Sequence, residues 1–210
     1  MNLYLMRHAN AGVPRDNPVL DDKRGIIKEG KQQCLMMGRM LAAAGVQIDV
    51  IVSSPLKRAK QTAQFVATEV GSEAPVLVSK ALAPDGEWAA FQELISQYSD
   101  REGVLLVGHN PNMSQFLGRL LTGNGPGSGA SSVRMRKAGV ARVDIGRRPA
   151  QLQWLLDPRM MRSIAVMAGK SARALSAKAR AAKAKAAKAA KAKAAKTVKP
   201  KAGPAKGGKK

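Results

Sequence analysis

Two histidines and two arginines stand out as residues that could do chemistry together. The chain has 210 residues and only two histidines, His8 and His109. Arg7 directly precedes His8, and Arg58 lies midway between the histidines in the sequence. Guanidinium groups fit phosphate oxygens, and nearby positive charge keeps an imidazole neutral enough to attack phosphorus. Such a set indicates phosphoryl transfer, which depends mainly on positioning and charge stabilisation.

Three apolar runs predict buried strands, and these strands would position the histidines and arginines. The runs are NLYLM (2–6), DVIVSS (49–54) and GVLLVGH (103–109). Such runs of Val, Ile and Leu are typical of parallel strands covered on both faces. Ligands of parallel sheets bind outside the carboxyl ends of the strands. If the three strands are neighbours, we expect both histidines and both arginines to meet at one crevice.

Segments with apolar residues at helical spacing alternate with the strands. We place Pro55 in the first helical turn, where its missing N–H costs nothing, and Gly45 and Gly71 at helix ends. A helix starting near Pro111 would point backbone N–H groups into the crevice. The order predicts an α/β fold with a mostly parallel central sheet and helices on both faces. The expected helices span residues 29–45, 55–71, 86–99 and 111–123.

The pattern changes after a glycine- and serine-rich loop at residues 123–132. Polar and apolar residues alternate in SVRMR (132–136), GVARVDIG (139–146) and QLQWLL (151–156). We expect these three segments to form a small meander of strands at a sheet edge.

A basic tail follows, and we set the boundary between residues 1–158 and 159–210. Residues 170–210 hold 15 of the 36 Lys and Arg residues and no Asp or Glu. Their Ala/Lys repeats predict a disordered or loosely helical segment. The tail is either a solubilising appendage or a non-specific polyanion-binding segment, and its unbalanced charge favours the second. It resembles the tails of bacterial histone H1-like proteins, so we favour DNA over RNA, polyphosphate or an anionic membrane surface.

Three segments together resemble a known family. LMRHANAG (5–12), SSPLKRAKQTA (53–63) and LLVGHNP (105–111) are similar to the signature segments of the histidine phosphatase (phosphoglycerate mutase-like) superfamily. The short length and the LAPDGE segment (82–87) are most similar to its SixA-type phosphohistidine phosphatase branch. The resemblance covers about residues 1–157, apart from the tail.

The resemblance implies a role for each site residue. His8 would be the nucleophile that is transiently phosphorylated, and Arg7 and Arg58 would bind the phosphoryl group. His109 would stabilise the charge on the equatorial oxygens. We also expect Asn10 to offer its side chain or backbone N–H to phosphate. No cofactor or metal ion is expected.

Two departures from the family pattern bear on the reaction. Ala9 stands where the family usually has Gly, which is tolerated unless that position needs a positive φ. Larger members use an acidic residue to protonate the leaving oxygen, and here Glu87, with Asp85 behind it, is the best candidate. A phosphohistidine substrate needs no strong acid, because solvent or His109 could protonate its leaving imidazole.

These observations predict a metal-independent phosphatase acting on phosphohistidine in a signalling or phosphotransfer protein. The alternatives are a phosphomonoesterase for a small metabolite and a non-catalytic DNA-binding protein that acts through its tail. We expect a cytoplasmic location, with nucleoid association if the tail binds DNA, because no secretory signal or membrane-spanning run is evident. The single Cys34 is expected to be a buried apolar residue of a helix.

Overall fold

The computed structural model describes residues 1–123 and 133–168. It divides into the units Met1–Ser163 and Ile164–Lys210, and the first unit carries the sheet. Residues 158–163 of the first unit are helical, as are residues 164–168 of the second. The boundary expected at residue 158, and the tail expected at 170–210 with its resemblance to histone H1-like proteins, stay predictions, because the tail lies outside the described residues.

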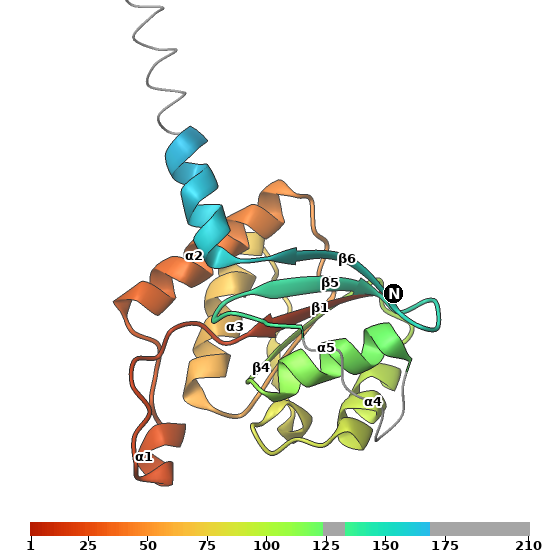
Figure 1. The fold of residues 1–210 in the computed structure, drawn as a ribbon, viewed down its shortest axis with the longest axis horizontal. Helices are drawn as coiled ribbons and strands as arrows, with labels where there is room; N and C mark the ends of the chain where they lie inside the picture. Colours follow the sequence, from red (N-terminus) through yellow and green to blue (C-terminus); the bar gives the residue numbers. More distant parts are fainter. Residues whose placement is uncertain (124–132, 169–210) are drawn as a thin grey trace, which may run out of the picture. The chain divides into compact units, whose positions relative to one another are not determined.

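A six-stranded sheet in the order β3-β2-β4-β1-β5-β6 forms the centre of the first unit (Figure 1). The first four strands in that order pair in parallel, whereas β5 pairs antiparallel with β1, and β6 pairs antiparallel with β5. The α/β class is therefore confirmed, with a mixed sheet in which the antiparallel pair lies at one edge. The strands are β1 (Asn2–Arg7), β2 (Val50–Ser53), β3 (Val76–Val78), β4 (Gly103–Gly108), β5 (Val140–Asp144) and β6 (Gln151–Leu156).

Helices cover both faces of the sheet because alternate residues of its central strands point to opposite sides. Leu3 and Leu5 pack with α4 (Trp88–Ser96) and α5 (Asn112–Thr122). Tyr4 and Met6 pack with α2 (Lys28–Ala43) and α3 (Lys57–Val70). Cys34 lies fully buried in this second core, as expected.

Two predicted local features are wrong. Pro55 lies outside the first turn of α3, because Leu56 stays extended and its carbonyl accepts the N–H groups of Ala59 and Lys60. Residues 133–136 of the expected SVRMR strand do not form one. Side chains bond the backbone of Met135 instead: its N–H donates to Ser114, and its carbonyl accepts from Arg7 and Asn110.

Three short elements were not expected from the sequence: α1 (Pro18–Asp22), the 3-10 turn η1 (Lys80–Leu82) and β3. Each has five residues or fewer, too short for a clear periodic pattern. Within the described part of the chain, no helix is both long and apolar enough to cross a membrane.

Candidate active site

The site lies where three adjacent parallel strands end. Arg7 of β1 pairs with Gly108 of β4, and the N–H of His8 donates to the Gly108 carbonyl at 2.9 Å. His8 and His109 therefore follow two paired positions. Their rings lie 4.9 Å apart between centroids, at an interplanar angle of 50°. The sheet order thus brings together the two histidines as predicted.

His8 is buried, and its surroundings fix its protonation. Burial, opposed in part by the Ala9 carbonyl and reinforced by the charges of Arg58, Arg7 and Lys137, lowers the pKa of His8 to about 3. Nδ1 lies 2.8 Å from the Ala9 carbonyl oxygen, which only accepts, so Nδ1 carries the proton of the neutral ring. The lone pair of the neutral ring therefore lies on Nε2.

The loop that carries His8 is tied to α3. The Ala9 N–H donates to Thr62 Oγ1 at 3.0 Å, and the Thr62 hydroxyl donates to the Arg58 carbonyl at 2.7 Å. Ala9 is fully buried and has no positive φ; among the described non-glycine residues only Ala138 has one. The loop geometry therefore places no demand for glycine at position 9.

Arg7 and Arg58 are both held by one edge of their guanidinium groups. Arg7 Nη1 donates to the Met135 carbonyl at 3.1 Å. Arg58 Nη1 donates to the Asp21 carbonyl at 2.9 Å and lies 3.1 Å from the Asp21 carboxylate. The Nε atoms of both arginines are buried without a hydrogen-bond partner. Burying a charged donor without a hydrogen-bond partner costs free energy. Two such donors in one site therefore suit a bound anion, which can accept from both.

His109 is fixed by a serine at the end of β2. Its Nε2 lies 2.8 Å from Ser54 Oγ, and both residues are buried. Burial, together with the nearby His8 imidazole and the positive charges of Arg58 and Arg7, lowers the pKa of His109 to about 3. Both imidazoles are therefore neutral at physiological pH, beside two cationic guanidinium groups.

Asn10 lies beside the site with its polar atoms already engaged. Its backbone N–H donates to Gln33, its side-chain N–H donates to Glu29, and its Oδ1 accepts from Lys137 Nζ at 2.9 Å. The expected contact of Asn10 with phosphate stays a prediction, and it would require one of these bonds to be exchanged.

Glu87 and Asp85 are exposed residues ahead of α4. Glu87 is the N-cap residue of that helix and borders a shallow cavity with Trp88, Gln115 and Arg119. In the described part of the chain, no hydrogen bond or ion pair joins Glu87 to the histidines or arginines of the site. Its role as general acid stays a prediction.

The sequence reasoning missed Ser54, Thr62, Lys137 and Asp21. Ser54 had a readable signal, since it is a hydroxyl residue at the carboxyl end of a predicted strand, beside Arg58. Lys137 had none, because it is 127 residues from the partner that it bonds. No three His, Cys, Asp or Glu side chains of residues 1–123 and 133–168 are grouped so as to hold a metal ion.

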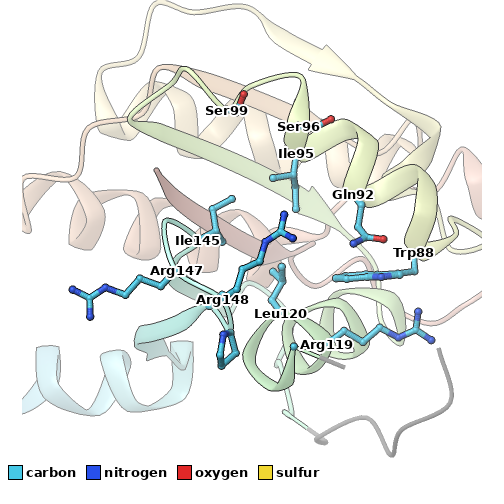
Figure 2. Close-up of a pocket in the computed structure, with 13 residues that line it drawn as sticks. Trp88, Gln92, Ile95, Ser96, Ser99, Arg119, Leu120, Ile145, Arg147 and Arg148 are labelled. Atoms are coloured by element: carbon cyan, nitrogen blue, oxygen red, sulfur yellow. The ribbon is translucent and has the colours of Figure 1, made fainter. Parts of the chain in front are cut away.

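A second cavity, of about 460 Å³, lies near the other end of the sheet (Figure 2). Trp88, Arg119, Arg147 and Arg148 are among its lining residues. Its Ile145 follows Asp144, the residue of β5 that pairs with the first residue of β1. Arg119 lies over the Trp88 ring at 5.5 Å, and Arg147 and Arg148 are exposed, so this cavity combines an aromatic surface with positive charge.

A family model and several known proteins match parts of this chain. The model of a family described as "Histidine phosphatase superfamily (branch 1)" matches residues 3–83. An uncharacterized protein of Picosynechococcus sp. is 28% identical over 67% of this chain and 82% of its own. The phosphohistidine phosphatase SixA of Escherichia coli is 23% identical over 60% of this chain and 78% of its own.

A solved structure supports the same fold. The protein histidine phosphatase SixA complexed with tungstate matches with a TM-score of 0.67 and 21% identity, covering 77% of this chain and 99% of that one. At this identity the likeness establishes the fold alone. The family model over residues 3–83 and the relatives thus show a similarity to the histidine phosphatase superfamily, and the solved structure shows that the fold is shared.

Proposed function

We propose that this protein is a phosphatase that works through a phosphorylated His8 and removes phosphate from phosphohistidine in a signalling or phosphotransfer protein. One observation carries the proposal: a neutral His8 with its lone pair on Nε2 lies beside two arginines with buried, unpaired Nε–H donors. A phosphoryl group satisfies both features at once. It accepts from the guanidinium groups and offers its phosphorus to the imidazole.

The proposed reaction has two displacements at phosphorus. In the first, His8 Nε2 bonds to phosphorus while the P–N bond to the substrate imidazole breaks, and the leaving nitrogen takes up a proton. In the second, water attacks the phosphorylated His8, which releases phosphate and restores the neutral ring. Arg7, Arg58 and His109 stabilise the negative charge on the equatorial oxygens in both displacements.

The protonation state of Asp21, whose carboxylate lies 3.1 Å from Arg58, favours phosphohistidine over an alcohol phosphomonoester as substrate. Hydrogen bonds from Arg24 and from the Arg15 N–H lower the pKa of Asp21 to about 2. Asp21 is therefore a carboxylate at neutral pH and a poor general acid. An alkoxide leaving group needs such an acid, whereas an imidazole is basic enough to be protonated by solvent, which is the expected donor because His109 is itself neutral at this pH. The likeness to SixA of Escherichia coli supports the same substrate class.

The test is dephosphorylation of a phosphohistidine-bearing carrier protein, compared with a phosphoserine peptide and an aryl phosphate. We expect the wild-type protein to act on phosphohistidine and His8→Asn to lose this activity by roughly 10³-fold or more. Acid-labile, alkali-stable phosphate should be trapped on the wild-type protein alone. Activity of His8→Asn equal to that of the wild type would refute the nucleophile. A preference for the aryl phosphate would favour the alternative of a small-metabolite phosphomonoesterase.

We further propose that residues 170–210 bind polyanions without sequence preference, with DNA as the favoured ligand. The composition supports this, with 15 basic and no acidic residues in the segment. Binding driven by counterion release weakens steeply with salt. Deletion of residues 170–210 should abolish DNA binding and leave hydrolysis of an aryl phosphate intact. DNA affinity that survives the deletion would place the binding surface elsewhere.

A further inference from the structure

A basic cavity of about 450 Å³ adjoins the candidate active site. It shares Arg7 with that site and is bordered by Asn10 and Asn110. Six basic side chains line it, against the two acidic ones of Glu29 and Asp157. The basic residues are Arg7, Arg134, Arg136, Lys137, Arg159 and Arg162.

The acidic residues do not balance this charge. Asp157 pairs with Arg136 at 2.8 Å, whereas Glu29 lies 3.8 Å from Arg162, near the limit of an ion pair. Lys137 Nζ donates to the neutral Oδ1 of Asn10. Arg134 and Arg159 are exposed and form no ion pair with another described residue. The cavity therefore presents a net positive surface to solvent.

The cavity lies next to the place where a phosphoryl group would bind, because Arg7 belongs to both. The Met135 carbonyl accepts from both Arg7 Nη1 and Asn110 Nδ2, at 3.1 Å each, so one backbone group joins the two regions. The positive charge of Lys137 also reaches His8, where it contributes to the lowered pKa of the imidazole. A substrate with its phosphorus at His8 would extend past Arg7 into this cavity.

We propose that the cavity is a second anion subsite that binds acidic side chains flanking the phosphohistidine of a protein substrate. This inference rests on the proposed function and specifies its substrate. Exposed guanidinium groups along an open rim match several separate carboxylates, each bound by a fork of two N–H donors. A compact second phosphate would instead suit buried unpaired donors, and among the described arginines only Arg7 and Arg58 have these.

Two synthetic phosphohistidine peptides test the subsite, one flanked by Glu residues and the other by Gln at the same positions. Their hydrolysis is compared in the full-length wild type, in Arg134→Gln/Arg159→Gln and in Arg147→Gln/Arg148→Gln. The last variant is a matched control, since it removes two exposed arginines from the other cavity. All three proteins keep residues 170–210, so binding by that segment is common to them.

We expect the wild type and the control to prefer the Glu peptide in kcat/KM. Arg134→Gln/Arg159→Gln should lower this preference roughly threefold to tenfold, through KM, with hydrolysis of an aryl phosphate unchanged. The preference should also fall with added salt. An equal preference in the two double variants would overturn the subsite.

Binding of the unphosphorylated, fluorescently labelled peptides separates this inference from the proposed function. If neither phosphopeptide is hydrolysed but Arg134→Gln/Arg159→Gln alone weakens binding of the Glu peptide, the substrate assignment fails and the subsite stands. If both double variants bind the Glu peptide equally, the subsite fails whatever the activity. Competition by a bisphosphorylated sugar without any Glu preference would also overturn the assignment to carboxylates.

Discussion

The two arginine-containing ends of the sheet differ in how their charge is held. At the carboxyl ends of β1, β2 and β4, Arg58 and both histidines are buried, and Arg7 and Arg58 retain unpaired Nε donors. In the cavity of Figure 2, by contrast, Arg147 and Arg148 are exposed to solvent. Water screens an exposed charge and lets its side chain move, whereas a buried charge acts strongly and from a fixed position. Positive charge therefore marks both ends, but of the two only the first holds it buried and in a fixed position.

In a comparison of the two ends, the largest effect should come from changing the shape of a site cation while keeping its charge. Arg7→Lys replaces a planar fork with a point charge, and kcat/KM for phosphohistidine should fall roughly 100-fold. Arg148→Lys makes the same change at the other end of the sheet and should leave kcat/KM unaltered. Steady-state kinetics of both variants measures the difference. Equal effects would remove the distinction between the two ends.

A smaller effect should follow loss of the hydroxyl that positions His109. Ser54→Ala removes the partner of Nε2, so the ring loses its fixed orientation and kcat should fall roughly tenfold with little change in KM. Ser53→Ala is the matched control, since its equally buried hydroxyl donates to the Ser54 carbonyl instead. A fall in kcat of the same size in both variants would indicate a general packing defect rather than a positioning role.

The buried imidazoles should also make stability depend on pH. Their pKa values are lowered to about 3, so the unfolded chain, with histidine near 6.5, binds more protons between these values. The stability they contribute is complete above about pH 6.5 and is lost as pH falls toward 3. Urea midpoints should therefore decrease from pH 7 to pH 5, and less steeply in His8→Asn. An unchanged slope in that variant would show that His8 is not the source.

The histidine NMR signals should show no change with pH in the neutral range. The ring resonances of His8 and His109, the only histidines in the chain, should stay constant from pH 8 to pH 5. An exposed histidine would titrate near 6.5 over the same range. NMR of the imidazole ¹³C–¹H groups measures this directly. A midpoint near 6.5 for either ring would contradict its neutral, buried state.

The sequence predicted three of the four parallel strands, β1, β2 and β4, because each is an unbroken apolar run, and the carboxyl ends of β1 and β4 placed the two histidines correctly. For residues 133–136, prediction of a strand from the sequence pattern was wrong. Their alternation is that of a strand, yet Met135 is buried while its backbone bonds to side chains. Lys137 and Asp21 could not be predicted either. Lys137 reaches the site through a bond to Asn10, which is distant in sequence. Asp21 contacts Arg58 from a helix of only five residues.

The antiparallel direction of β5 has a consequence for how this site could change over time. The chain before β5 returns to the ends of β1, where the Ala138 N–H bonds the Arg7 carbonyl at 3.0 Å and Met135 supports the Arg7 side chain. In the proposed reaction and subsite, the reacting histidines and the cations Arg134 and Arg136 therefore lie on separate segments of backbone. On that proposal, substitutions at Arg134 or Arg136 would change partner choice and leave the chemistry in place, so a duplicated copy of this fold would acquire a new partner in few mutations.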